Sequence, residues 1–474
     1  MPISEIPISK GVFKTQNGRA LRNSEFASDL VNLFIGPAGE NFDRPTLALH
    51  TTLDSTEIIG THSFAGLLVF VTLDRKVYTV DLAGNVTDIT GSTLPGASRP
   101  TFTYDKDALY IAGGGAPLKW QGIGTTTALL GGTPPDMTHI VYLDGFLIGN
   151  RQLVAENFKV LQFSEYETPE TWTGTNVFSA VADPDPLQGL AVSQRELYAV
   201  GQKTTEVWQN VGSYPVPFSR AFVWQYGTPA PYSICSADNS VFFIDQDHRI
   251  MRIVGRQPMR MSEAIENELF KYETVTDCWS SSFTWKGSIH VLFVFPTAQR
   301  AWSVNLANNQ WTQWYGYDNG LSRVRINSVF YLEDSGRVFA GDYQTGKVWE
   351  FSDTEKTDAE GVFKRVRKFS HRDLGGSIRK QSNMVRINLE RNVAPEYEGT
   401  TSQTNPTLEL RWKDDNRPWS EWRRASLGER GERKYYAEFR RLGIYRTRQY
   451  ELQISDPAEL NMVSVETEEE AMAS

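Results

Sequence analysis

The chain has 474 residues, a formal net charge of −9 at pH 7 and a hydrophobic fraction of 40%. This apolar content suffices for a large packed core and excludes a chain that is disordered throughout. The acidic balance argues against a general nucleic-acid clamp, because such a protein needs clustered positive charge to bind the phosphate backbone. Two cysteines, Cys235 and Cys278, are too few for a disulfide framework and fit assembly in a reducing cytoplasm.

Residues 1–45 are polar and rich in Gly and Asn, with one apolar patch at residues 30–35. The segment has neither a basic start nor an apolar core, so no signal peptide is expected. The longest apolar run, residues 66–73, is less than half of what spans a bilayer, so we predict a soluble protein without membrane insertion of its own. We interpret residues 1–45 as an N-terminal arm that packs on or closes the next domain; the alternative is an arm that reaches a neighbouring subunit.

Residues 46–353 repeat one short sequence motif. Each copy consists of a strand-like run, a tight turn and a second strand-like run that carries a large residue. Successive large residues are separated by 42, 41, 47, 43, 51 and 47 positions. Units of roughly 40–50 residues with room for four strands are typical of β-propeller blades. The copies are centred on Tyr78, Trp120, Leu161, Trp208, Met251, Trp302 and Trp349.

The first unit contains four strand-like segments, at residues 57–61, 66–72, 76–81 and 86–89. Asp, Gly and Asn separate these β-branched and aromatic runs, and such residues accept the backbone angles of hairpin turns. One four-stranded sheet cannot bury both of its faces, so units of this kind stack around an axis. The sequence therefore predicts an all-β fold with a propeller of six or seven blades over residues 46–353.

One short helix is expected as an insertion in the propeller region, at residues 261–271. Ser262 can cap it, and Glu263, Glu266 and Glu268 lie towards its start. Acidic side chains are favourable there because the N-terminal end of a helix carries partial positive charge.

Residues 354–382 are predicted to form a polar connector, in which an acidic stretch precedes a basic one. The acidic stretch, residues 353–360, has a superficial similarity to a calcium-binding loop. Asp358, however, stands where the tight turn needs Gly, and the bidentate Glu is not in place. No metal site is expected there.

Residues 383–467 are predicted to form a second, sandwich-like β domain. A hairpin with aromatic residues on both sides spans residues 412–422, and residues 468–474 are expected to be a frayed acidic tail. Strands are expected at residues 383–389, 407–412, 434–439 and 446–454.

Charge is divided unevenly along the chain. Residues 361–450 carry 21 Lys and Arg against 11 Asp and Glu, a net charge of +10, so the remainder sums to −19. A solvated basic face is one interpretation; docking onto an acidic protein surface, or occasional contact with phosphates, is the other. Within this region we predict a protein interface at Arg423, Arg424, Arg440 and Arg441.

No convergent catalytic or metal-binding residues are recognised. The six histidines are scattered, and there is no Gly-x-Ser-x-Gly elbow, phosphate-binding loop or dinucleotide fingerprint. Residues 245–248 follow an apolar strand and are interpreted as a hairpin turn rather than an acid–base or metal site. Asp183 and Asp185 each precede a proline, which favours an extended loop over paired catalytic carboxylates. We predict no enzyme activity and no cofactor.

One turn has an enzyme-like appearance. Residues 415–419, Asp-Asn-Arg-Pro-Trp, are similar to the aspartate-box turn of sialidases and related glycan-handling propellers. Those families carry several such turns inside the blades, with an arginine cluster, a Tyr and a Glu for the chemistry. Here one copy lies outside the predicted propeller, and Arg417 replaces the usual Gly, so the turn is interpreted as structural.

Both ends of the chain carry distinctive segments. The start reads MPIS, with SDLVN at residues 28–32, and the end carries LRWKDD at 410–415, WSEWR at 419–423, RRLG at 440–443 and ISDP at 454–457. These segments resemble the packaged-DNA stabilisation proteins of short-tailed phages, which are tail nozzle proteins of similar length. The motifs that carry the resemblance are structural.

The resemblance implies a virion tail component without enzyme activity, assembled in the host cytoplasm. Members of that family form a six-membered ring below the portal and its adaptor ring, extend the DNA channel and retain the packaged double-stranded DNA. They also present surfaces to tail spikes, fibres, a plug or a needle. The acidic balance outside residues 361–450 suits a lumen along which DNA slides without sticking, and the basic part suits docking to another protein.

Two other functions remain open on the sequence alone. One is a glycan-binding or glycan-cleaving propeller, which two carboxylates about 5–10 Å apart at the propeller mouth would support. The other is a general interaction propeller that serves as a scaffold. Self-association into a ring distinguishes the nozzle from the scaffold.

Overall fold

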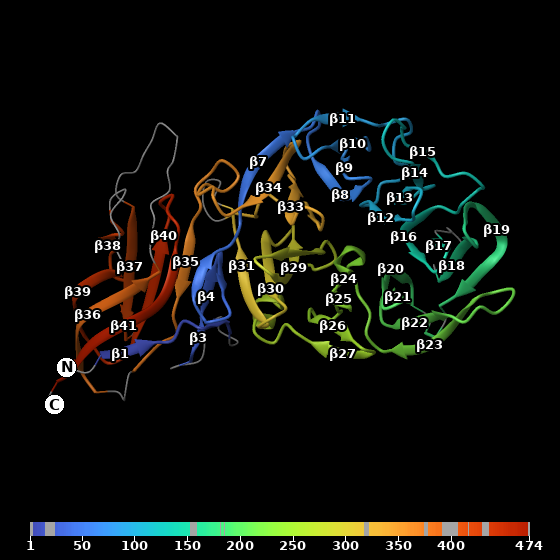
Figure 1. Ribbon diagram of the computed structural model, residues 1–474. Helices are drawn as coiled ribbons and strands as arrows, with labels where there is room; N and C mark the ends of the chain where they lie inside the picture. The colour runs from blue at the N-terminus through green and yellow to red at the C-terminus, as the bar shows by residue number, and fades with distance from the viewer. Residues whose placement is uncertain are drawn as a thin grey trace.

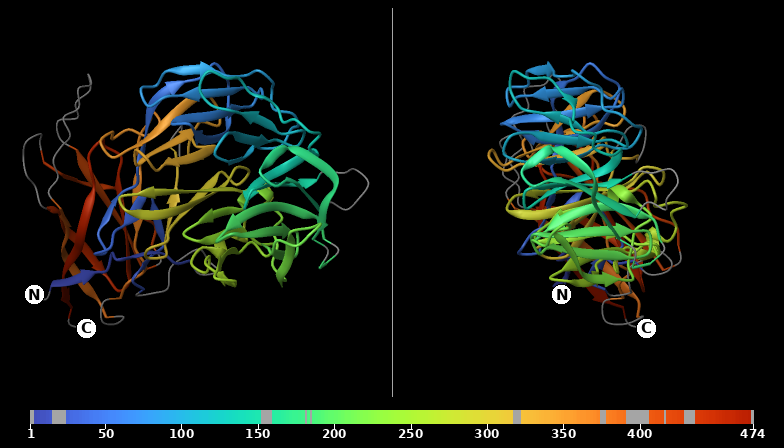
Figure 2. Two further views of the ribbon diagram at one scale, coloured as in Figure 1. Left: turned by 45° about the vertical axis from the view of Figure 1, so that its right-hand side comes forward. Right: turned by 90° about the vertical axis from the view of Figure 1, so that its right-hand side faces the viewer.

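The computed structural model describes residues 3–14, 24–151, 159–180, 182–183, 185–316, 322–373, 378–390, 406–415, 417–428 and 436–472. These residues form two β-rich parts, a propeller and a sandwich, that lie next to each other (Figure 1). Two further views show both ends of the chain at the sandwich (Figure 2). The all-β fold predicted from the sequence, a propeller with a C-terminal sandwich-like domain, is confirmed.

The propeller consists of seven groups of four antiparallel strands in the described chain, so the blade number that the sequence left at six or seven is seven. The first strands of successive blades contact one another in a closed ring around the axis (Figure 1). These first strands are β8 (Ile58–Phe64), β12 (Thr101–Tyr104), β16 (Met137–Leu143), β20 (Leu187–Ser193), β24 (Cys235–Ala237), β28 (Trp279–Trp285) and β32 (Ser328–Leu332).

The other three strands of each blade follow outwards from the axis. The second strands are β9 (Leu67–Thr72), β13 (Leu109–Ala112), β17 (Phe146–Arg151), β21 (Glu196–Gly201), β25 (Ser240–Ile244), β29 (Ser288–Phe295) and β33 (Arg337–Gly341). The third strands are β10 (Val77–Val80), β14 (Leu118–Trp120), β18 (Val160–Glu165), β22 (Thr205–Asn210), β26 (Ile250–Val254), β30 (Arg300–Asn305) and β34 (Lys347–Ser352). The fourth strands are β11 (Val86–Asp88), β15 (Ala128–Leu129), β19 (Thr168–Ser179), β23 (Phe218–Trp224), β27 (Gln257–Arg260), β31 (Gln310–Trp314) and β7 (Thr46–Thr52).

The large residues of the repeated sequence motif lie in the third strand of every blade. Each of its large residues is buried, from Leu161 and Trp302 at 0% exposed to Trp208 at 8%. A third strand has neighbours on both edges and an adjacent blade on each face, so it favours apolar side chains. The second strands are enclosed at least as fully, as in β25, which is buried along its whole length, whereas the third strand β22 ends in two half-buried residues.

Tight turns connect the first and second strands of several blades. In five of them two successive residues have positive φ, as in Ala65 and Gly66 at 53° and 76° and Asp144 and Gly145 at 47° and 91°. Two such residues in a row form the turn whose twist matches that of the flanking strands. These turns lie where the first strands pass into the second strands, at one end of the propeller axis.

Strand β7 closes the propeller. It pairs with β34 from Thr46–Ser352 to Thr52–Lys347, and so supplies the outer strand of the seventh blade from the N-terminal side of the chain. Leu47 is buried at 1% exposed, whereas Leu49 is 46% exposed. Ring closure thus depends on a strand at the start of the predicted propeller segment rather than on residues 1–45.

The sandwich consists of two sheets. One has the order β39-β36-β41-β6-β5, with β1 on β41, and the other has the order β4-β35-β40-β37-β38. Leu410, Phe439, Leu452 and Val465 belong to the apolar core between them. The strands are β1 (Ile3–Ile6), β4 (Asp29–Val31), β5 (Leu33–Ile35), β6 (Asn41–Asp43), β35 (Arg365–Lys368), β36 (Lys380–Leu389), β37 (Thr407–Asp414), β38 (Arg423–Ser426), β39 (Tyr436–Tyr445), β40 (Arg448–Ile454) and β41 (Asn461–Ala471).

One sheet runs from the propeller into the sandwich. Strand β4 of the N-terminal arm lies between β31 of the sixth blade and β35, so nine strands form one continuous sheet. The arm also contributes β1, β5 and β6 to the other sheet, and its short strands β2 (Lys10–Val12) and β3 (Phe26–Ala27) pair in parallel. Within this chain, the arm joins the two parts.

Two expectations on segment character are wrong. Part of the expected polar connector, residues 354–382, is strand β35, which is paired on both edges because β4 and β40 flank it. The expected frayed tail, residues 468–474, is strand up to Ala471, and Glu469 is only 8% exposed. Both segments look polar in sequence because the sandwich buries charged side chains together with their partners. Residues 434–435 of the third expected strand and 473–474 of the tail lie outside the described residues.

The expected helix at residues 261–271 is shorter. Helix α1 comprises Glu266–Leu269 and has no side-chain cap, because the Ser262 hydroxyl instead accepts the backbone N–H of Ile250. The Ser262 carbonyl accepts the N–H groups of Ile265 and Glu266 at 2.8 and 2.9 Å. A 3₁₀ turn, η1 (Pro231–Ser233), precedes the fifth blade.

Candidate functional site

The four arginines predicted to form an interface are exposed at one edge of the sandwich. Arg423 and Arg424 begin β38, and Arg440 and Arg441 lie in β39; these are edge strands of the two sheets. Arg423 Nη1 donates to the carbonyl oxygens of Arg440 and Arg441 at 2.8 and 3.2 Å. The fold therefore brings these residues of β38 and β39 together.

Two of these arginines are already paired with carboxylates. Arg424 Nε lies 2.8 Å from Glu409 Oε1, and Arg440 Nε donates to Glu438 Oε1. The Arg440 hydrogen bond lowers the pKa of Glu438. Arg423 lies 4.8 Å from the Trp412 ring centroid and has no carboxylate partner among the described residues. The edge thus presents positive charge that is partly compensated.

Several basic residues of the 361–450 region lie inside the molecule instead of on its surface. Arg365, Arg367 and Arg448 are at most 1% exposed, and Lys380 is 3% exposed. Arg448 Nε and Nη2 bond to the Asp414 carboxylate at 2.6 and 2.9 Å. The net charge of +10 therefore overstates the positive surface that a partner would meet.

Arg44 occupies the junction between the propeller and the sandwich. Its guanidinium pairs with Asp358 at 2.6 and 3.2 Å and also bonds to Asn32 Oδ1 and to two backbone carbonyls. The Arg44 Cζ atom lies 4.7 Å from the Trp314 ring centroid. Asp358, at the position that excluded a calcium loop, is thus one half of a buried ion pair.

Arg365 and Arg367 reach from β35 towards the N-terminal arm. Arg365 Nη1 lies 3.0 Å from Asp43 Oδ2, and Arg367 Nη1 donates to Asn41 Oδ1 at 2.7 Å. Burial lowers the pKa of Arg367 to about 9 and raises that of Asp43. The sequence contains no local signal for these contacts, because the partners are more than 300 positions apart.

A second polar network, centred on the buried Asn327, lies where the first strands begin. Asn327 Oδ1 accepts from Arg323 Nη2 and Arg99 Nη1 at 3.0 and 3.3 Å, and its amide donates to Glu57 Oε1 at 2.9 Å. Arg99 also covers the Trp279 ring, 4.7 Å from its centroid. Burial and the nearby Arg323 charge lower the pKa of Arg99 to about 9. Sequence reasoning missed this network, whose members precede strands in different blades.

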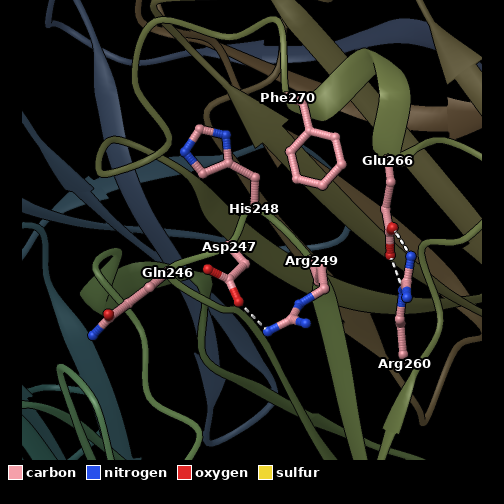
Figure 3. A pocket seen from close by; sticks show the side chains of 7 residues that line it. All are labelled: Gln246, Asp247, His248, Arg249, Arg260, Glu266 and Phe270. Atoms are coloured by element: carbon pink, nitrogen blue, oxygen red, sulfur yellow. Dashed lines mark hydrogen bonds and ion pairs between the residues drawn. The ribbon is translucent and has the colours of Figure 1, made fainter. Parts of the chain in front are cut away.

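The segment 245–248 is the predicted hairpin turn, beside an open pocket of ≈ 530 Å³ (Figure 3). Asp245 Oδ1 accepts the N–H groups of Asp247 and Arg249, and Arg249 pairs with both Asp245 and Asp247. Across the pocket Arg260 and Glu266 form another ion pair. Each carboxylate shown in Figure 3 has an arginine partner, which leaves none of them in the role of a free base.

The other carboxylates considered for chemistry also hold loops. Asp185 accepts the N–H and hydroxyl of Thr204, each at 3.0 Å, and it is not paired with Asp183. Asp415 accepts the N–H of Thr447 at 2.9 Å, so the aspartate-box-like turn fixes the neighbouring hairpin. Residues 184 and 416 lie outside the described residues.

Three histidines have a lowered pKa: His139 and His290 are buried, and His62 is half-buried. Burial lowers the pKa of His62 and His139 to about 4 and that of His290 to about 3. His290 stacks between Phe34 and Phe283, with ring centroids 4.4 and 5.3 Å away. Within the described ranges, no three His, Cys, Asp or Glu residues are grouped as a metal site would need.

The fold and these sites define a seven-bladed propeller with an attached sandwich, in which most charged groups serve structural pairing. The chain belongs to the phage stabilisation family described as "Bacteriophage P22 Gp10, beta-propeller", whose model matches residues 51–356. The match begins at the end of strand β7 and covers the propeller to its last blade. This places the protein among structural phage proteins and confirms the family resemblance seen at both ends of the sequence.

Solved structures resemble the chain at low identity. The designed protein Ika8 is 13% identical, with 64% of this chain and 99% of that chain covered and a TM-score of 0.40. Virginiamycin B lyase from Staphylococcus aureus is 12% identical, with 66% and 99% covered and a TM-score of 0.44. The extracellular domain of the hybrid two-component system BT4673 from B. thetaiotaomicron is 10% identical, with 86% and 61% covered and a TM-score of 0.45. These likenesses carry no argument about function.

No curated protein sequence matches the chain. Among the residues that the structure describes, no helix is long and apolar enough to cross a membrane.

Proposed function

We propose that the protein is a non-enzymatic tail nozzle of a short-tailed phage. Copies of the chain form a ring, expected to be a hexamer, below the portal and its adaptor. The ring extends the DNA channel, retains the packaged double-stranded DNA without sequence specificity and docks fibres, spikes or a needle. The observation that carries this proposal is the family match over residues 51–356.

The distribution of charge supports the proposal. The chain outside residues 361–450 sums to −19, and a duplex slides more easily past a surface that does not neutralise its phosphates. The exposed sandwich edge with Arg423, Arg424, Arg440 and Arg441 offers positive charge to an acidic protein surface. Channel and docking surface are thus assigned to different parts of the molecule.

The absence of catalytic activity is part of the proposal. The described carboxylates considered above are held by arginines, backbone N–H groups or hydroxyls. A general base has to be within reach of a substrate proton and unpaired enough to accept it. These sites support stability of the turns and not acid–base chemistry.

Cryo-electron microscopy of the intact particle's tail, reconstructed without imposed symmetry, tests the proposal. We expect a ring of this chain coaxial with the portal, with DNA density that ends inside the ring. A chain that is missing from this position, or that forms a peripheral appendage, would contradict the nozzle function. Glycan binding and hydrolysis would then be the next assays.

A further inference from the structure

The propeller axis opens into a pocket of ≈ 760 Å³ at the end where first strands turn into second strands. Its walls come from β8, β12, β24, β28 and β32, which are first strands of five blades, and from the turns that follow them. We name it the axial pocket. Unlike the depression in Figure 3, it joins residues from distant parts of the chain.

Aromatic rings form one wall of the axial pocket. The His62 ring lies 4.9 Å from that of Phe330 and 5.7 Å from that of Tyr104, measured between centroids. Tyr104 is 57% exposed, although it lies in a strand of the inner ring. A large aromatic side chain in this position offers a flat, accessible face to a ligand.

Two hydroxyl groups of the wall are oriented as hydrogen-bond acceptors. The Ser281 hydroxyl donates to the Val329 carbonyl at 2.8 Å, and that of Ser236 donates to the Val192 carbonyl at 3.0 Å. Each hydroxyl oxygen keeps lone pairs after its hydrogen is engaged.

His62 adds a further acceptor. Its Nδ1 lies 2.7 Å from the Ser63 carbonyl and therefore carries the proton of the neutral ring. Desolvation by its surroundings lowers the pKa of His62 to about 4, so Nε2 is an unprotonated acceptor at neutral pH. Nε2 has no hydrogen-bond partner in the part of the chain that the structure describes.

The charged residues of the lining are all acidic: Asp105, Asp238, Glu333 and Asp334. Asp105 is engaged by backbone N–H groups and by the Tyr110 hydroxyl, and Asp238 pairs with Arg252. Glu333 and Asp334 are exposed and have no cationic partner among the described residues. Lys106 beside the rim is not part of the lining and lies 4.0 Å from Asp107.

We propose that the axial pocket binds an arginine side chain of a partner polypeptide, inserted along the propeller axis. A guanidinium has five N–H donors and no acceptor, and it stacks on aromatic faces. It therefore complements the exposed Tyr104 face, the acceptor atoms of the wall and the two unpaired carboxylates of the rim. A phosphate or another anion finds no cation in the lining.

This inference does not depend on the nozzle proposal. It concerns the isolated chain, and a tail that assembles as expected would neither establish nor exclude it. Conversely, an arginine-binding pocket can exist on a propeller with another role. The two proposals are therefore tested by separate measurements.

Titration of the full-length protein with a labelled Gly-Arg-Gly-Arg-Gly peptide, followed by fluorescence anisotropy, tests the inference. The matched control peptide carries citrulline in place of arginine, which keeps the shape and removes the charge. We expect the citrulline peptide to bind at least about tenfold more weakly, and the arginine affinity to fall with added salt.

Variants locate the binding. The double substitution Glu333→Gln and Asp334→Asn, and separately Tyr104→Ala, change exposed side chains and should each weaken arginine binding without lowering the unfolding temperature. The control Glu263→Gln with Glu273→Gln removes the same charge from exposed positions outside the lining and should leave the affinity unchanged.

Several results would overturn the inference. Equal affinity for both peptides, or an equal loss in the control variant, would indicate nonspecific attraction to an acidic surface. Binding of a neutral oligosaccharide that Tyr104→Ala abolishes, without arginine binding, would assign the pocket to a glycan. Self-association that the Glu333/Asp334 variant abolishes, again without peptide binding, would assign it to a second copy of the chain.

Discussion

At the scale of single residues, buried histidines link stability to pH. His139 and His290 are 5% and 2% exposed, with pKa values lowered by burial to about 4 and about 3. The unfolded chain binds protons at an ordinary pKa of about 6.5, so acidification below that value favours unfolding. Their contribution to stability is present above pH 6.5 and is lost as the pH falls towards 4.

We predict that these two residues account for a loss of about 2 kcal/mol each between pH 7 and pH 5. Urea denaturation of the wild type and of the His139→Phe/His290→Phe variant at both pH values measures this. The difference between the two proteins isolates the histidines from Asp43 and Glu57, whose raised pKa values act in the opposite direction. An identical pH response of variant and wild type would contradict the assignment.

The Arg44–Asp358 pair provides a second prediction at this scale. Both side chains are at most 2% exposed, so removal of one partner leaves a buried group without compensation. Arg44→Met and Asp358→Asn should each lower the free energy of unfolding by about 3–5 kcal/mol, and the double variant by less than their sum. The control Arg195→Met removes an arginine that is 81% exposed and should cost less than about 1 kcal/mol. Equal losses for Arg44 and Arg195 would show that the pair is not the junction contact we describe.

At the scale of elements, strand β7 allows a matched test of ring closure. Leu47 and Leu49 lie on the same strand, but Leu47 is buried and Leu49 is 46% exposed. Leu47→Asp places a charge in the core of the seventh blade and should destabilise the protein by more than about 3 kcal/mol, whereas Leu49→Asp should change stability by less than about 1 kcal/mol. Chemical denaturation followed by tryptophan fluorescence gives both values. Similar losses for the two variants would argue against the register of β7 on β34.

The sequence predicts some strands of the fold and misses others. The seven large residues from Tyr78 to Trp349 locate the third strands, because each of these residues is itself at most 8% exposed and packs in the propeller core. Strand β41 was missed because only two of its four buried positions are apolar: Met462 and Val465 are, whereas Thr467 and Glu469 are polar. Strand β35 was missed because its buried residues include Arg365 and Arg367. In both strands, distant polar partners replace the local signal.

The candidate sites also differ in whether the sequence predicts them. The hairpin character of residues 245–248 follows from local chemistry, since an apolar strand precedes a turn whose Asp accepts nearby N–H groups. The axial pocket does not follow from local chemistry. Its lining residues, among them His62, Tyr104, Ser281 and Glu333, come together only when five blades are arranged around the axis. The predicted interface at Arg423, Arg424, Arg440 and Arg441 is exposed in the fold, and its partner stays a prediction.

At the scale of the whole molecule, the sandwich edge should control tail assembly. Reversal of Arg423, Arg424, Arg440 and Arg441 to Glu should reduce the yield of complete tails by more than about tenfold, because like charges across an interface are strongly unfavourable. Binding of the chain to DNA should be unaffected. In vitro complementation of tail-deficient particles measures the yield.

The control for this reversal changes the same number of charges elsewhere. The control variant reverses Lys106, Arg195, Lys203 and Lys271 to Glu. All four are exposed on the propeller, and assembly should stay near the wild-type level. Normal assembly of the sandwich-edge variant, or an equal defect in the control, would show that this edge is not a docking surface. Thermal unfolding of both variants verifies that neither has lost its fold.

The continuous nine-stranded sheet has a mechanical consequence. A sandwich attached by a flexible linker would swing when pulled, and little of the load would reach the propeller. Here β4 is held between β31 and β35, and Arg44 fastens the arm to Asp358 beside it. A force on the sandwich would therefore reach the sixth blade through main-chain hydrogen bonds, and the two parts should move as one lever.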